Sequence, residues 1–167
     1  MTRRAAPLAA IRLLVLDVDG VLTDGQLHYG PDGERDKVFH VHDGFGVRAL
    51  AAAGVTIAVI SGRNSAAVAQ RCAELGIREV QQGVEDKARA LTTLLARLDI
   101  AARECACIGD DTPDVPMFKL AGLAIAVAGA HADAHRAAHR RTRLRGGAGA
   151  VREVCDWLLA ARARADR

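Results

Sequence analysis

An uninterrupted apolar run, Leu13 to Leu16, ends in two carboxylates one residue apart, Asp17 and Asp19, followed by Gly20. A run of this kind is typical of a strand buried on both faces of a parallel sheet. Open α/β sheets bind their ligands beside the carboxyl ends of their strands. The two acids are therefore expected at a ligand site at the edge of the core.

Two neighbouring carboxylates repel each other, and burying both as anions is costly unless a cation joins them. Mg²⁺ suits such a position because it prefers oxygen ligands and commonly takes one or two protein carboxylates, leaving positions for water and a substrate phosphate. A strand end with solvated acids is the plainer alternative. A calcium-binding EF-hand loop is excluded, because Val21 stands where the third acidic ligand belongs and no helix precedes the loop.

The chain has the length of one domain, 1–167. Its strand-like and helix-like segments alternate, which predicts an α/β fold with a Rossmann-like parallel sheet and helices on both faces. The turn-prone residues 30–33 between two short apolar segments predict a β-hairpin extension over about residues 25–42. The expected strands are 13–16, 55–60, 79–81, 105–108 and 124–127, and the expected helices are 46–53, 65–75, 85–98, one after Pro113 and a last one that contains Val151 to Leu159.

The net charge is only +3, and we interpret the basic segment His139–Arg145 as a solvated face. Nucleic-acid binding is disfavoured, because no aromatic side chains interleave with these cations to stack on bases. The four cysteines lack zinc-ligand spacing and no secretion signal is evident, so we expect a reducing, cytoplasmic location. The apolar stretches are too short to cross a bilayer, so no membrane partner is expected.

Other strand ends also carry polar groups. Ser61-Gly62-Arg63 follows the second expected strand, where a hydroxyl, a backbone N–H and a guanidinium at a helix start suit a phosphate. Lys87 lies early in the next helix, where the helix dipole gives a cation no advantage. Gly109-Asp110-Asp111 follows a later strand, with Asp114 one turn on. Taken singly, these are an ordinary N-cap, an exposed lysine and a turn.

Together, Asp17-x-Asp19, Ser61-Gly62-Arg63, Lys87 and Gly109-Asp110-Asp111-x-x-Asp114 resemble the phosphatases of the haloacid dehalogenase superfamily. The resemblance implies that Asp17 is a nucleophile, that Asp19 is a general acid and base, and that Ser61 and Lys87 bind phosphoryl oxygens. It also implies Mg²⁺ held by Asp17, the backbone carbonyl of Asp19 and Asp110, with Asp111 and Asp114 as supporting acids.

The chain between Asp24 and Ser61 leaves no room for a cap domain. Relatives without a cap tend to form homo-oligomers in which a neighbour closes the site, and here the resemblance implies a tetramer built through the hairpins. Fuller motifs, including Asp43-Gly44-Phe45-Gly46 and the glycine-rich residues 146–149, are similar to superfamily members that act on a phosphorylated sugar acid of bacterial lipopolysaccharide. The implied substrate-binding residues are His40, Val41, His42, Asp43, Gly44, Arg48, Gly62, Arg63, Arg71 and Lys87. Many relatives carry arginine in the segment that here contains His42, which makes a contact with the sugar carboxylate weaker or pH-dependent.

Four alternatives remain open from the sequence. The chain could act on an acylneuraminate 9-phosphate, or it could be a non-catalytic oligomerisation module, although it keeps the acids and the lysine. Residues 146–149 are read equally as a lid over a neighbour's site or as a turn before the last helix. His131, His135 and His139 recur every fourth position and could form a metal-binding stripe on a helix, although a solvated polar face is favoured.

Overall fold

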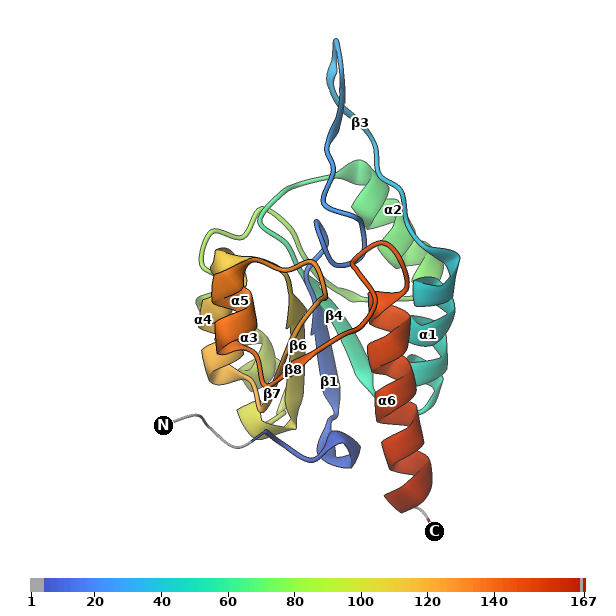
Figure 1. Cartoon of the computed structure of the whole chain (residues 1–167), viewed down its shortest axis with the longest axis vertical. Helices are drawn as coiled ribbons and strands as arrows, with labels where there is room; N and C mark the ends of the chain where they lie inside the picture. Colours follow the sequence, from blue (N-terminus) through green and yellow to red (C-terminus); the bar gives the residue numbers. More distant parts are fainter. Residues whose placement is uncertain (1–4, 166) are drawn as a thin grey trace.

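A computed structural model of the protein describes residues 5–165 and residue 167, and its centre is a parallel sheet (Figure 1). Within the described residues, the sheet has six strands in the order β5-β4-β1-β6-β7-β8. The strands are β1 (Leu13–Leu16), β4 (Thr56–Ile60), β5 (Glu79–Gln81), β6 (Cys105–Gly109), β7 (Leu123–Ala126) and β8 (Arg140–Arg141). The expected α/β class and parallel sheet are confirmed.

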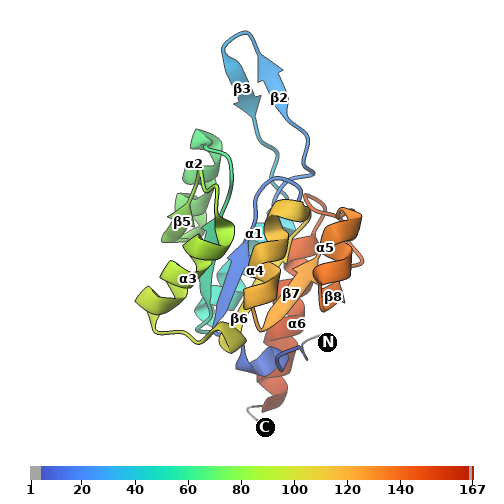
Figure 2. The same cartoon turned by 90° about the vertical axis from the view of Figure 1, so that its left-hand side faces the viewer.

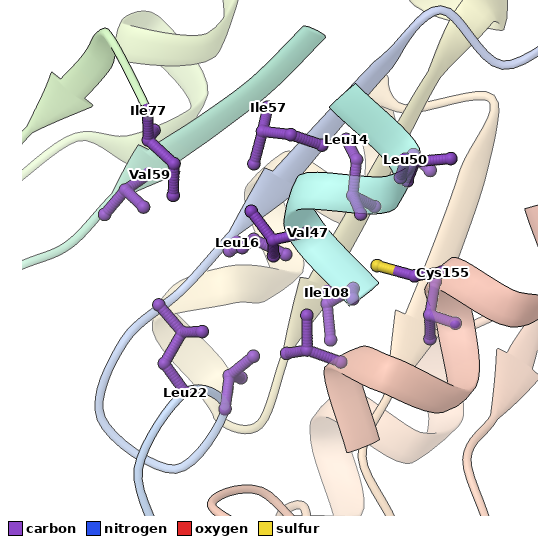
Figure 3. Packing of buried hydrophobic residues seen from close by; sticks show 14 of the residues in the cluster. Leu14, Leu16, Leu22, Val47, Leu50, Ile57, Val59, Ile77, Ile108 and Cys155 are labelled. Atoms are coloured by element: carbon purple, nitrogen blue, oxygen red, sulfur yellow. The ribbon is translucent and has the colours of Figure 1, made fainter. Parts of the chain in front are cut away.

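Helices cover both faces of this sheet (Figures 1 and 2). Their bounds are α1 (Val41–Ala52), α2 (Ala66–Leu75), α3 (Lys87–Leu98), α4 (Val115–Leu120), α5 (Ala132–Ala137) and α6 (Ala150–Ala165), with short 3₁₀ turns η1 (Leu8–Ala10), η2 (Ala102–Glu104) and η3 (Thr112–Asp114). Alternate side chains of a strand point to opposite faces. Thus Leu14 and Leu16 pack with α1, α2 and α6, as Figure 3 shows in part, and Leu13 and Val15 pack with α3, α4 and α5.

Helix α1 begins at Val41, five residues earlier than the sequence indicated, so the expected start at Gly46 was wrong. His40 is its N-cap, and the His40 side chain accepts a hydrogen bond from the His42 N–H. Glycines at positions 44 and 46 normally weaken a helix. Here close packing overrides that preference, because a Cβ on Gly46 would lie 2.9 Å from the Arg152 side chain of α6.

The hairpin is present and forms a separate two-stranded antiparallel sheet, β2 (His28–Gly30) with β3 (Gly33–Asp36). It projects from the end of the molecule at which the parallel strands finish (Figures 1 and 2). Exposed apolar side chains lie on it and beside it, namely Leu27, Tyr29, Val38, Val41 and Phe45. The hairpin is thus a projecting arm with exposed apolar side chains, and it is attached next to the carboxyl edge of the sheet.

The elements expected from the sequence did not include η1 or β8. Helix α5 ends at Ala137 and His131 is its N-cap, so a stripe of His131, His135 and His139 on one helix face was wrong. His139 instead accepts the Ala124 N–H through Nδ1. In the basic segment, the Arg140 guanidinium stacks 4.8 Å from the Trp157 ring centroid, and Arg143 pairs with Glu153 at 3.3 Å, so these cations pack on α6.

None of the helices in the described part of the chain has the length and apolar character needed to span a membrane. Cys72, Cys105, Cys107 and Cys155 are all buried free thiols.

Candidate active site

The candidate site lies where β1 and β6 end side by side. The chain runs from β1 to β4 and β5 on one side and returns to β6 on the other, so a topological switch point falls between β1 and β6. Leu16 pairs in register with Ile108, and the Asp17 N–H donates to the Ile108 carbonyl at 3.1 Å. This pairing places the residues after both strands at one edge, where open α/β sheets bind ligands.

Three carboxylates converge at this edge. Oxygen atoms of Asp17, Asp110 and Asp114 lie within 4.8 Å of one another. Gly20 makes room for this approach, because a Cβ there would lie 2.0 Å from Asp110 Oδ2. Asp114 Oδ1 accepts from Lys87 at 2.7 Å, and its Oδ2 accepts the Asp110 and Asp111 N–H groups at 2.9 and 3.2 Å. Since both Asp114 oxygens are engaged, Asp17 and Asp110 are better placed to hold a cation.

The electrostatics of the cluster also fit a divalent cation. Burial raises the pKa of Asp17 to about 7, and the negative charge of Asp114 adds to this although Lys87 opposes it. Burial raises the pKa of Asp110 to about 7 as well, with Asp17 and Asp114 adding to the shift. Near neutral pH each carboxyl is therefore only partly ionised, and further positive charge would favour its anionic form. The donor set and its excess negative charge fit Mg²⁺, which binds oxygen ligands.

Lys87 is a buried cation of the site, and its side chain is 5% exposed. Its Nζ lies 2.9 Å from Asp17 Oδ1 and 2.7 Å from Asp114 Oδ1. Burial alone would lower the pKa of Lys87, but Asp17 and Asp114 outweigh that effect and raise it. Lys87 thus stays charged at the first residue of α3 because two carboxylates compensate for its position at the helix start.

Asp19 faces two other cations, Lys37 and Arg63. Lys37, just after β3, donates from Nζ to Asp19 Oδ1 at 2.5 Å. Arg63 Nε lies 3.9 Å from Asp19 Oδ2, and the Arg63 guanidinium donates to the Tyr29 hydroxyl of β2 at 2.7 Å. The side chains around Asp19 therefore come from the loop after β4, from the hairpin and from the residue that follows it.

A cavity of about 320 Å³ opens over these groups. Ser61 is almost fully buried at the end of β4, and its Oγ accepts the Arg63 N–H at 3.4 Å. The cavity is lined by Asp17, Asp19, Gly25, Ser61, Gly62, Arg63, Lys87, Asp110, Asp111, Pro113 and Asp114. The lining combines carboxylates with a hydroxyl and two cations, which are the groups that a phosphate ester and a metal ion would require.

The comparisons with known proteins agree with this chemistry. A model of the haloacid dehalogenase-like hydrolases matches residues 77–146. The 3-deoxy-D-manno-octulosonate 8-phosphate phosphatase of Escherichia coli (strain K12) is 47% identical over 156 residues, which are 93% of this chain and 83% of that protein. The chain belongs to this family of haloacid dehalogenase-like hydrolases.

Solved structures of the same phosphatase family have the same fold. The phosphatase from Moraxella catarrhalis, solved with a magnesium ion, a phosphate ion and a KDO molecule, is 42% identical with a TM-score of 0.92, over 96% of this chain and 92% of that one. The cobalt-bound phosphatase from Haemophilus influenzae is 41% identical with a TM-score of 0.92, over 94% of this chain and 92% of that one. Divalent metal ions are therefore bound by structures that this chain closely resembles.

Several residues that the sequence placed in a phosphatase site lie outside the cavity of their own chain. His40, Val41, His42, Gly44 and Arg48 belong to the first turns of α1 or its cap and do not line it. Arg71 on α2 pairs with Glu74 at 3.2 Å and lies against Gly44. One chain therefore brings together the phosphate-binding and acidic residues but not the whole predicted substrate set.

Asp43 and Asp111 have structural contacts in this phosphatase fold. Asp43 is buried, and its Oδ1 accepts the Arg152 N–H in the first turn of α6 at 2.8 Å. Burial raises the pKa of Asp43, although that hydrogen bond opposes the shift. Asp111 lines the cavity, and its carboxylate caps η3 by accepting the Thr112 N–H at 2.7 Å.

The glycine-rich residues 146–149 pack on their own chain. The Gly147 N–H donates to the Val21 carbonyl at 3.1 Å, in the loop that follows β1. This segment lines a second cavity of about 490 Å³ together with Asp24, Gln26 and Asp110. In a single chain the segment is thus a turn that supports the loop after Asp17, and the lid over a neighbour stays a prediction.

Sequence reasoning missed Lys37 and Tyr29. Tyr29 lies on the hairpin and Lys37 at its base. The residues there follow neither a helical nor a core-strand pattern, so the sequence does not indicate which side chains face the rest of the protein. A lysine immediately before an apolar-aromatic segment gives no signal of burial by itself, yet the Lys37 side chain is only 2% exposed.

Proposed function

We propose that this chain hydrolyses 3-deoxy-D-manno-octulosonate 8-phosphate to the free sugar acid and phosphate in lipopolysaccharide biosynthesis. The main support is that Asp17, Asp110 and Lys87 meet in one cavity in a chain that is 47% identical to a phosphatase of that specificity. We also propose a cytoplasmic location, which the four free thiols support.

Asp17, Asp110 and the Asp19 backbone carbonyl are proposed to hold Mg²⁺, with Asp114 and Asp111 fixing the loop that carries Asp110. The ion, when bound, neutralises charge on the phosphoryl group and lowers the repulsion between that group and the carboxylates. The support is the 4.8 Å cluster and the raised pKa values of Asp17 and Asp110.

The reaction is proposed to proceed in two displacements at phosphorus. A carboxylate oxygen of Asp17 forms a bond to phosphorus while the ester P–O bond breaks, and Asp19 gives its proton to the departing sugar oxygen. Asp19 then takes a proton from water as the water oxygen attacks phosphorus, which releases phosphate and restores Asp17. Lys87, the Ser61 hydroxyl, Gly62 and Arg63 bind the phosphoryl oxygens throughout.

The sugar acid is proposed to be recognised by two copies of the chain together. His40–Gly44, Arg48 and Arg71 do not line the cavity of their own chain, so we place them against the open side of a neighbour's cavity. Arginine can bind a sugar carboxylate through two parallel hydrogen bonds. A homotetramer joined through the hairpins would bring these residues there, and it would cover the exposed Tyr29 and Val38.

The proposed function is tested by measuring phosphate release from a panel of sugar acid phosphates with Mg²⁺ and with excess chelator. We expect the highest kcat/KM for 3-deoxy-D-manno-octulosonate 8-phosphate and a fall to background with chelator, because the carboxylate cluster then lacks its compensating cation. Preference for an acylneuraminate 9-phosphate would replace the proposed substrate. Absence of turnover with every ester would favour the oligomerisation module.

The proposed assembly is tested by light scattering. The wild-type chain is expected to have four times the monomer mass, and Val38→Asp is expected to reduce that mass because it buries a charge in the hairpin contact. Val38 is 67% exposed in one chain. Leu144→Asp, an exposed apolar position distant from the hairpin in sequence, is the control. A wild-type monomer at micromolar concentration would contradict the assembly.

A further inference from the structure

We infer that Lys37 is a positioning residue that orients Asp19 for proton transfer, and that the hairpin arm thereby sets the geometry of the acid. This inference rests on the proposed function, in which Asp19 protonates the leaving oxygen. Neither the motifs nor the comparisons assign Lys37 a role.

The burial of Lys37 supports a specific pairing. Its side chain is 2% exposed although it belongs to the connection between the projecting hairpin and α1. An ammonium group so buried needs a compensating carboxylate. Its Nζ donates to Asp19 Oδ1 at 2.5 Å, and Asp19 itself is only 21% exposed. The contact joins residues 18 positions apart, so it forms only when the base of the hairpin lies against the loop after β1.

The contact leaves the two Asp19 oxygens in different situations. Oδ1 accepts a hydrogen bond from Lys37, whereas Oδ2 lies 3.9 Å from Arg63 Nε, which is beyond hydrogen-bond distance. Oδ2 is therefore the oxygen that can carry the proton toward a leaving group. A proton donor must lie within about 2.6–3.2 Å of the atom it protonates, so a carboxyl that rotates loses much of its effect.

The hairpin provides a second support on the opposite side of Asp19. Tyr29 of β2 accepts a hydrogen bond from the Arg63 guanidinium at 2.7 Å, and Arg63 faces Asp19 Oδ2. Asp19 thus lies between a cation that follows β3 and a cation that is held by β2. A displacement of the arm would move both neighbours of the acid.

The test uses the different proton demand of two leaving groups. A sugar alkoxide needs a proton to depart, whereas p-nitrophenolate departs as a stable anion. The quantity compared is kcat/KM, which reports the steps through departure of the leaving group and excludes the later hydrolysis of the phosphorylated Asp17. A purely structural defect would lower kcat/KM for both esters by the same factor.

We expect Lys37→Met to lower kcat/KM for the sugar acid phosphate by about 10²-fold, as loss of general acid catalysis does. For p-nitrophenyl phosphate we expect a loss below about 5-fold, since the acid contributes little to that ester. Asp19→Asn should show the same pattern with a larger ratio. Lys119→Met, at an exposed lysine of α4, is the matched control and should leave both values unchanged.

Equal losses with both esters, or no loss with either, would overturn the inference. If Lys37→Met expresses poorly, Lys37→Gln serves as a second variant, because its side chain is a shorter donor. Its ratio of the two losses in kcat/KM should be intermediate. If the wild-type enzyme prefers another sugar phosphate, the proposed substrate fails. The inference is then decided by the same ratio measured with that alkyl ester.

Discussion

Asp17→Asn is expected to lower phosphate release with Mg²⁺ by at least about 10⁴-fold, as removal of a covalent nucleophile does in other enzymes. An amide nitrogen or oxygen cannot replace the carboxylate oxygen that attacks phosphorus. The variant keeps the shape of the side chain and leaves the Asp114 partner of Lys87 in place. Phosphate release by single-turnover assay and the absence of a trapped phosphorylated chain are the measurements.

The same substitution, which lowers activity, is predicted not to lower the stability of the metal-free protein. Burial raises the pKa of Asp17 to about 7 in the folded protein, above its ordinary value of 3.8. The stability associated with that shift is therefore present below about pH 4 and is lost as the pH rises through about 7. Without metal at pH 8, wild type carries the cost of a buried anion that asparagine lacks.

We therefore expect metal-free Asp17→Asn to melt at a temperature equal to or above that of wild type at pH 8. Asp156→Asn, which removes an exposed partner of Arg152, is the control for loss of a carboxylate and should retain activity. Turnover by Asp17→Asn near the wild-type rate would remove the nucleophile from the mechanism.

Lys87→Met is expected to lower the free energy of unfolding by about 3–5 kcal/mol at pH 8, because it leaves two buried carboxylates without their cation. Lys87 is 2.9 Å from Asp17 and 2.7 Å from Asp114. The loss should be smaller at pH 5.5, since the pKa of Asp17 is raised to about 7 in wild type, and removal of Lys87, which lowers that pKa, leaves Asp17 mostly protonated there. Urea unfolding at the two pH values, without metal, measures the difference.

Activity should fall with the same change by about 10²–10³-fold, the usual effect of removing one charge that stabilises a transition state. Lys119→Met serves again as the comparison, because substitution of an exposed lysine changes stability by less than about 0.5 kcal/mol. A Lys87→Met variant as stable as wild type at both pH values would show that Lys87 does not stabilise the folded protein by compensating the charges of Asp17 and Asp114.

The acidic edge could be predicted from the sequence because strand ends have a fixed position in a parallel sheet. Once Leu13–Leu16 and Cys105–Ile108 are assigned as neighbouring buried strands, Asp17 and Asp110 must emerge together. Lys87 was found for a related reason, since a cation at the start of a helix opposes the helix dipole and so indicates another partner. These inferences depend on local patterns and on one topological rule.

The remaining features depend on contacts that no local pattern encodes. The early start of α1 is stabilised by packing of Gly46 against α6. Lys37 is buried by the way the hairpin base meets the loop after β1. Asp43, expected among the substrate-binding residues, accepts a hydrogen bond from a helix that lies 109 positions later in the sequence. Its role toward substrate stays a prediction, and its structural contact could only be found in three dimensions.

The Asp43 contact has a consequence for the order in which the protein matures. A carboxylate in the first third of the chain accepts a backbone N–H in the first turn of α6, and the residues just before α6 hold the loop after Asp17 through the Gly147 N–H. During synthesis, the nucleophile is therefore made early but its supporting loop is secured last. We expect a nascent chain that stops before residue 150 to possess every catalytic side chain and still lack a fixed catalytic loop, so that competence arrives only with the final helix.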